Sequence, residues 1–138
     1  MCLALYVELV GVSTDKAEEI AAHCSTISDL IVRPAVSSGD QANCHFVVVE
    51  FSEGCACSML AEHASPEAPT WSLRPDVLPK LASVLRCLLA RTRSGVGLEA
   101  AWLGDDDEPT EVRVSSRDLL AVVAEGGIRT KTRYLTAT

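Results

Sequence analysis

Two cysteines separated by a single residue, Cys55 and Cys57, are the side chains of this sequence best suited to chemistry. They follow a strand-like run and Gly54, in a stretch without regular periodicity, and irregular loops after strands often hold reactive groups. Two thiols at this spacing can bind a soft metal ion, form a strained and easily reduced disulfide, or fill space. The residues alone leave these three interpretations open.

A structural zinc site needs four nitrogen or sulfur ligands, so this pair requires two more. Cys2 and, as a weaker candidate, His63 are the groups available for that role. Zinc patterns more often use Cys-x2-Cys in pairs, and a second pair is missing. The candidate metal ligands are thus Cys2, Cys55 and Cys57, with His63 as a weaker candidate and zinc or iron as the metal, while redox work and packing remain alternatives.

The metal hypothesis carries a geometric condition. If Cys2 starts the first strand and Cys57 follows the third, the two thiols meet only where those strands run antiparallel and side by side. The redox hypothesis has less support, because the nearby Glu53 and Glu62 favour the neutral thiol over the reactive thiolate.

Two of the other cysteines, Cys24 and Cys87, are expected to be structural. Cys24 lies on the apolar stripe of one helix and Cys87 lies within another, positions typical of small core residues. Cys44 and His45 are neighbours on a strand and point to opposite faces, so they cannot act on each other as nucleophile and base.

Length and composition indicate one globular domain over residues 1–138. The chain is 48% hydrophobic and 22% charged, values ordinary for a folded protein. A net charge of -7 repels phosphate backbones and anionic membranes, so no nucleic-acid or membrane partner is expected. The apolar start lacks a basic leader and no stretch approaches the roughly 20 apolar residues of a membrane span, which predicts a cytoplasmic protein with free or metal-bound thiols.

Hydrophobic periodicity predicts alternating strands and helices. In the first strand, Leu3, Leu5, Val7 and Leu9 share one face while Tyr6 and Glu8 take the other. Strands are expected over 1–12, Leu30–Val36, Cys44–Phe51, Val96–Leu103, Thr110–Val114 and Thr130–Leu135. Helices are expected from Asp15, from about Asp76, and from a Ser115 cap to Gly126 and Gly127. The stretch 52–72 reads as irregular, with one helical turn near Met59–His63.

This order of elements predicts an α+β fold, a single-domain two-layer sandwich with a mixed, mainly antiparallel sheet and about three helices. Pro34 confines its strand to an edge or a bulge. The acidic turn Gly104–Glu108 is expected to join the strands Val96–Leu103 and Thr110–Val114 as a hairpin. A doubly wound parallel sheet is the alternative, weakened by that hairpin and by the lack of a glycine-rich phosphate loop.

Short segments of the chain resemble a family of small uncharacterised bacterial proteins. These segments are the opening Met-Cys-Leu-Ala-Leu-Tyr, the central Glu-Gly-Cys-Ala-Cys, and Trp102-Leu-Gly-Asp. Family members begin Met-Cys-x-Ala-Leu-Tyr and carry Glu-Gly-Cys-x-Cys-Gly-Phe, where this chain has Ser58 and Met59 in place of Gly-Phe. The resemblance implies that Cys2, Cys55 and Cys57 belong to one constellation, and it implies no activity.

Two classes of function follow from these observations. In the first, the protein is a small metal- or thiol-dependent domain, an enzyme or a sensor, that uses the three cysteines. In the second, it is a non-catalytic binding or assembly module whose cysteines only pack, with a protein partner or a second copy of itself. The sequence does not decide whether the protein is an enzyme.

Overall fold

The computed structural model describes residues 3–35, 43–51, 56–61, 70–102, 108–125, 127–129 and 131–136, without the side chains of Asn43, Trp71 and Trp102. The strands in these ranges are β1 (Leu3–Val10), β2 (Ile31–Pro34), β3 (Asn43–Val49), β4 (Thr70–Trp71), β5 (Val96–Trp102), β6 (Thr110–Val114), β7 (Ile128–Arg129) and β8 (Thr132–Thr136). The helices are α1 (Thr14–Ser28), α2 (Leu78–Arg91), α3 (Ser116–Ala124) and the short 3-10 turn η1 (Ala56–Met59).

Six strands form one mixed sheet in the order β2-β3-β1-β5-β8-β6. Every neighbouring pair is antiparallel except β6 and β8, which run parallel. The described part of the chain is therefore the predicted α+β fold with a mainly antiparallel sheet. As the sequence predicted from Pro34, β2 is an edge strand. At an edge, the missing backbone N–H of proline costs the sheet no hydrogen bond.

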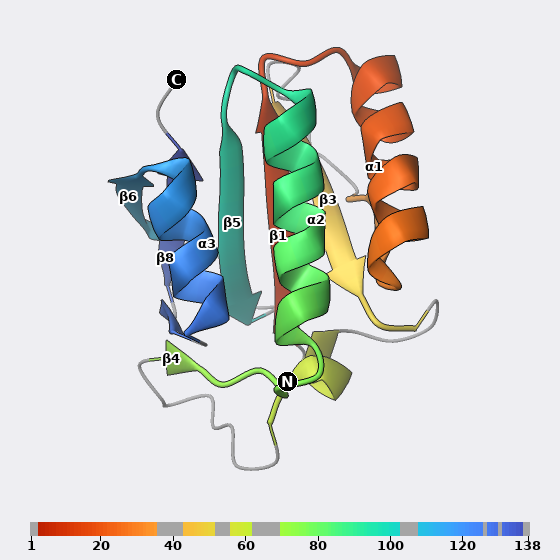
Figure 1. The fold of residues 1–138 in the computed structure, drawn as a ribbon. Coiled ribbons are helices and arrows are strands. Elements are labelled where there is room, and N and C mark those ends of the chain that lie inside the picture. Colours follow the sequence, from red (N-terminus) through yellow and green to blue (C-terminus); the bar gives the residue numbers. More distant parts are fainter. Residues whose placement is uncertain are drawn as a thin grey trace.

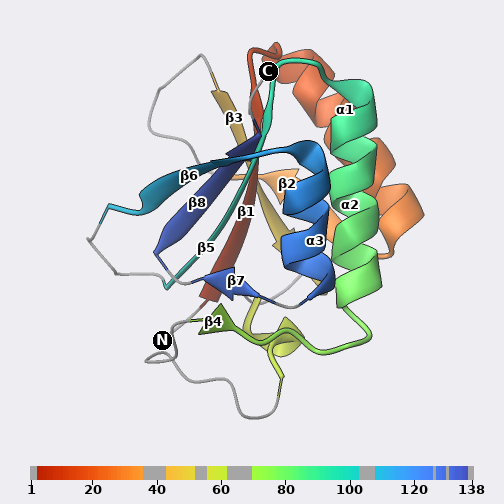
Figure 2. The same cartoon turned by 60° about the vertical axis from the view of Figure 1, so that its left-hand side comes forward.

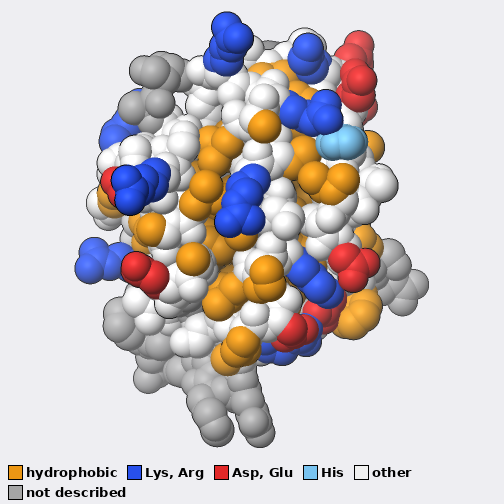
Figure 3. Space-filling model, in the orientation of Figure 1, with side chains coloured by type: hydrophobic (Ala, Val, Ile, Leu, Met, Phe, Trp, Pro, Cys, Tyr) orange, Lys and Arg blue, Asp and Glu red, His pale blue; other side chains and the backbone are white. Residues whose placement is uncertain are grey.

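The three α-helices cover one face of this sheet, and α2 lies between α1 and α3 (Figures 1 and 2). The two layers are thus the sheet and the helices. No helix in the described ranges lies on the other face, which we name the helix-free face (Figure 2). Seen from the helical side, Lys and Arg side chains are spread among apolar ones over the surface (Figure 3).

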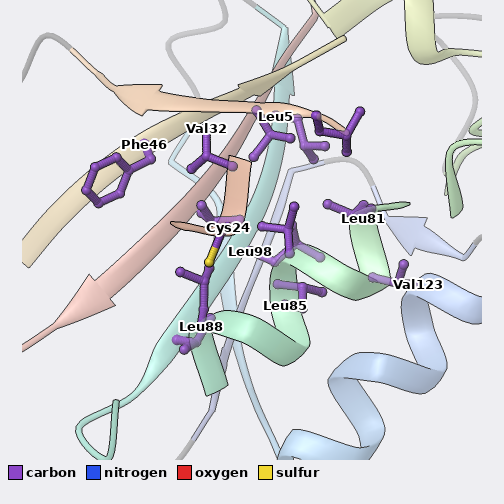
Figure 4. Packing of buried hydrophobic residues seen from close by; sticks show 14 of the residues in the cluster. Leu5, Cys24, Val32, Phe46, Leu81, Leu85, Leu88, Leu98 and Val123 are labelled. Carbon is purple, nitrogen blue, oxygen red and sulfur yellow. The ribbon is translucent and has the colours of Figure 1, made fainter. Parts of the chain in front are cut away.

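The core lies between the sheet and the helices (Figure 4). Alternate β1 side chains fill it from the sheet, as the period-two pattern predicts, and they are Leu3, Leu5, Val7 and Leu9. The central helix α2 contributes a continuous apolar stripe of Leu81, Val84, Leu85 and Leu88. Because each of these side chains is almost fully buried, the hydrophobic effect fixes which face of β1 meets the helices.

Serine caps begin two of the helices. The Ser115 hydroxyl accepts the N–H of Asp118 at 3.0 Å, which confirms the predicted start of α3. For α1 the predicted start at Asp15 is wrong by a residue, because Ser13 is the cap and accepts the N–H of Lys16 at 3.4 Å. Asp15 instead lies in the first turn, where a carboxylate interacts favourably with the helix dipole.

The expected hairpin between Val96–Leu103 and Thr110–Val114 is wrong. β8 lies between β5 and β6, and β6 is parallel to β8 with α3 in the connection between them. β8 thus occupies the place beside β5 that was expected for β6. Four of the five β8 residues are buried, whereas three of the five β6 residues are exposed. β8 carries one charged residue and β6 carries two, so the strand with fewer charges takes the interior position and the more charged strand becomes the edge.

The stretch predicted to be irregular contains more structure than expected. Among the described residues of this stretch, a helical turn forms at η1, earlier than the predicted Met59–His63, and the buried side chains of Ala56 and Met59 pack into the core. The end of the predicted turn, at His63, lies outside the described residues. Further along, β4 pairs with β7 in a separate two-stranded sheet, which the sequence did not predict. Within the described ranges, no helix combines the length and the apolar character that crossing a membrane requires.

Candidate functional site

Cys57 is the one predicted ligand that lies within the described residues. Cys2, Cys55 and His63 lie outside them, so their predicted roles stay predictions. Among the described residues, no group of three or more His, Cys, Asp or Glu side chains could hold a metal ion. A complete metal site would therefore need the predicted ligands outside those ranges.

The Cys57 side chain lies in η1 beside the start of β1. Its Sγ accepts a hydrogen bond from the backbone N–H of Leu3 at 3.0 Å, across 54 positions of sequence. The side chain is half-buried, and Ala56 before it is buried whereas Ser58 after it is exposed. A backbone donor aimed at sulfur favours the thiolate form, which is the form that binds metals and acts as a nucleophile.

Arg74 fixes the position of this turn. Its backbone N–H donates to the carbonyl of Met59 at 2.8 Å, and its guanidinium donates to the carbonyl of Ser58 at 2.8 Å. The same guanidinium binds the carboxylates of Glu50 and Asp76, and the hydrogen bond to Arg74 lowers the pKa of Asp76. One side chain thus joins the end of β3, the thiol-bearing turn and the segment before α2.

The strand arrangement meets the geometric condition set by the sequence. β1 and β3 are antiparallel neighbours, so the start of β1 and the end of β3 lie at the same end of the sheet. Leu3 follows Cys2 in the sequence, and Ala56 follows Cys55. The hydrogen bond from the Leu3 N–H to the Cys57 sulfur links these two parts of the chain.

The other described cysteines are structural, as predicted for two of them. Cys24 and Cys87 are buried between α1 and α2, and burial together with a mutual hydrogen bond raises the pKa of the Cys24 thiol. The half-buried Cys44 donates to the carbonyl of Val12 at 3.5 Å. None of these three thiols forms a disulfide bond.

A second polar region, which sequence reasoning did not select, lies on the helix-free face. Glu8 of β1 is only 3% exposed, yet it is charged and doubly paired. His45 Nε2 donates to its Oε2 at 2.8 Å, and Arg133 binds its Oε1. Arg133 also donates to Glu111 at 2.9 Å, so one network joins β3, β1, β8 and β6.

The protonation of this network is set by mutual pairing. Burial alone would raise the pKa of Glu8, but hydrogen bonds and charges from His45 and Arg133 lower it below its ordinary value. The hydrogen bond from Glu8 raises the pKa of His45. Burial raises the pKa of Glu99, a neighbour on the same face. A carboxylate-oriented imidazole of this kind can act as an acid or base near neutral pH.

Gly97 makes the network possible. β5 separates β1 from β8 in the sheet, so the pair between Glu8 and Arg133 must cross β5. Gly97 lies opposite Glu8, and a Cβ at this position would come within 3.2 Å of the Glu8 Cβ. Any other residue would therefore crowd the buried carboxylate.

A sequence signal for this network existed. Glu8 interrupts an otherwise apolar strand, and alternation already placed it opposite the face of Leu5, Val7 and Leu9. Its partners come from strands far apart in sequence, and only the strand order brings them together.

No protein-family model, no curated protein and no solved structure matches this chain. The resemblance to the family of small bacterial proteins accordingly remains a prediction from short segments.

Proposed function

We propose that this protein binds a soft metal ion, zinc in the first instance, at the end of the sheet where η1 meets the start of β1. Cys57 is the central ligand, Cys2 and Cys55 are the further thiolates, and His63 is the weaker fourth ligand. The observation that carries the proposal is the 3.0 Å hydrogen bond from the Leu3 N–H to the Cys57 Sγ.

The chemistry of the segment supports this proposal. Backbone N–H groups that donate to sulfur stabilise thiolates, and groups that orient the ligands of a metal site are part of its design. Arg74 holds the carbonyls of Ser58 and Met59, so the turn that carries Cys57 has a fixed backbone. A fixed backbone lowers the entropy that a metal must overcome when it gathers its ligands.

The proposal includes a reducing, cytoplasmic setting, in which thiols stay free to bind metal. It includes no nucleic-acid partner, since the chain carries a net charge of -7. The role of the metal follows from the number of protein ligands. Four would make a closed structural site, whereas three would leave a position open for water or a substrate.

The test is metal content after anaerobic purification, with Cys57→Ser as the diagnostic variant. We expect about one zinc per chain in the parent protein and loss of that zinc in the variant. Cobalt loaded in place of zinc should give a thiolate-to-cobalt charge-transfer band that disappears in the same variant. Cys44→Ser is the matched control, because Cys44 is also half-buried but lies in β3 and donates to Val12.

Two other results would point elsewhere. Thiols that oxidise and reduce reversibly without bound metal would favour a redox role, in which Cys55 and Cys57 form the labile disulfide. A protein without metal and without reactive thiols would favour the binding or assembly module.

A further inference from the structure

A hollow of about 320 Å³ lies beside the charged network, at the other end of β1 from the thiol-bearing turn. Its wall contains the guanidinium groups of Arg113 and Arg133 and the carboxylate of Glu111. Val10 and Leu135 supply apolar surface. The volume is at the lower end of the range for small-molecule sites, which are concave and combine apolar walls with a few polar groups.

Arg113 is the cation of this hollow with the most unused hydrogen-bonding capacity. Its Nε lies 3.4 Å from Glu111, and its side chain is 64% exposed. Its two terminal nitrogens form no hydrogen bond or ion pair with the described residues. Arg133, by contrast, uses both terminal nitrogens on Glu8 and Glu111. The free fork of Arg113 has the planar geometry that binds a carboxylate through two parallel hydrogen bonds.

Ser94 and Thr136 also line the hollow. Thr136 is only 4% exposed, its hydroxyl accepts the N–H of Val96 at 2.9 Å, and it alternates with Leu135 on β8, so its side chain faces away from the hollow. The half-buried Ser94 has no partner for its hydroxyl among the described residues, and its backbone N–H is bound to Thr92. The Ser94 hydroxyl can therefore donate to a ligand in the hollow.

We propose that this hollow binds a small carboxylate, with the carboxylate on Arg113 and the hydroxyl of Ser94, and a short apolar group against Val10 and Leu135. Glu111 opposes the anion and limits the affinity. Arg133 contributes charge, but its position is set by Glu8 and Glu111. This inference is independent of the metal proposal.

The test is an NMR titration of the ¹⁵N-labelled protein with sodium butyrate, against sodium chloride at the same ionic strength. We expect saturable shifts at the amides of Val10, Ser94 and Leu135 with butyrate only. Formate, which lacks the apolar group, should bind more weakly. Shifts that rise linearly without saturation, or equally with chloride, would overturn the proposal.

Arg113→Gln should weaken butyrate binding about tenfold or more, because the variant removes the charged fork. Arg86→Gln is the matched control, since Arg86 is an exposed arginine on the helical side. Equal affinity in both variants would reject the site. If Arg113→Gln disturbs the fold, Ser94→Ala tests the same site. We expect this variant to lower the affinity for butyrate several-fold.

A titration with inorganic phosphate tests whether the hollow prefers a carboxylate or a phosphate as its oxyanion. Tighter saturable binding of butyrate than of phosphate supports the carboxylate assignment, whereas saturation by phosphate alone overturns it. The titration is repeated with Cys57→Ser, whose affinity for butyrate should equal that of the parent protein. If Cys57→Ser loses the metal but still binds butyrate, the metal site and the carboxylate site are independent of each other.

Discussion

The two faces of β1 follow different rules although they belong to the same eight residues. On the helix-covered face, Leu5, Val7 and Leu9 are buried by purely apolar contacts. On the helix-free face, Glu8 is equally buried but is held by charged partners from two other strands. Apolar burial needs only matching volume, whereas a buried carboxylate needs named partners at fixed positions.

This difference also separates stability from specificity. A buried ion pair is weak support for stability compared with apolar packing, and it is costly to break one partner at a time. We therefore expect the network on the helix-free face to fix register and strand order more than it adds free energy. It also leaves His45 39% exposed, as an imidazole oriented by a buried carboxylate.

The largest expected effect lies on the helix-covered face. Leu98 of β5 is 1% exposed in the core, so Leu98→Ala should lower the free energy of unfolding by about 2–5 kcal/mol. Val47→Ala, on the half-buried helix-free side, should cost about 1 kcal/mol. Chemical denaturation measures both. Similar losses would mean that the helix-free face is also packed like a core.

The next effect concerns the buried carboxylate. Glu8→Gln keeps the shape but removes the charge, so His45 and Arg133 lose their shared partner while Arg133 retains Glu111. We expect a loss of roughly 1–3 kcal/mol. Glu111→Gln is the control, since that carboxylate is 40% exposed and should contribute less than about 1 kcal/mol. An equal loss in both variants would contradict the special role of burial at Glu8.

A smaller effect tests the crossing point over β5. Gly97→Ala introduces a Cβ within 3.2 Å of the Glu8 Cβ and should cost about 1–2 kcal/mol. Displacing Glu8 should also lower the pKa of His45 toward its ordinary value, which NMR titration of the imidazole measures. Gly127→Ala is the control, because nothing lies within 4 Å of the added Cβ there. An unchanged His45 pKa in Gly97→Ala would show that Gly97 does not position Glu8.

The sequence predicted one face of the sheet better than the other. Period-two burial in β1 and the capped helix after Ser115 are local patterns, and both are confirmed. The position of β8 between β5 and β6 depends on a comparison between distant segments, which local turn signals do not contain. The charged network of Glu8 could not be predicted for the same reason, because strand order decides which residues lie beside Glu8.

The candidate thiol site shows the same division. The pair Cys55 and Cys57 stands out by spacing alone, and the antiparallel pairing of β1 with β3 meets the condition for joining it to the start of the chain. The contact between Cys57 and Leu3, and the bracing by Arg74, could not be predicted, because these depend on a turn packed against a distant strand.

The smallest expected effect is a dependence of stability on pH. Folding raises the pKa of His45 above 6.5, chiefly through the hydrogen bond with Glu8. The folded state then binds this proton more tightly, so the stabilisation is complete below 6.5 and is lost as the pH rises through the folded value. Glu8 has a pKa below 4.5 in the folded state, so its share is present above 4.5 and is lost as the pH falls through the folded value.

Glu99 changes stability in the same direction as His45, because burial disfavours its charged form and raises its pKa, so ionisation costs stability as the pH rises above 4.5. His45→Gln removes only the imidazole contribution. Since His45 is 39% exposed, solvent screening should keep the difference between parent and variant below about 1 kcal/mol. Unfolding free energies measured from about pH 5 to about pH 9 should therefore decline more in the parent than in His45→Gln above 6.5. Parallel curves would mean that His45 gains nothing from Glu8, and the contrast between the two faces would then rest on Glu8 and Arg133 alone.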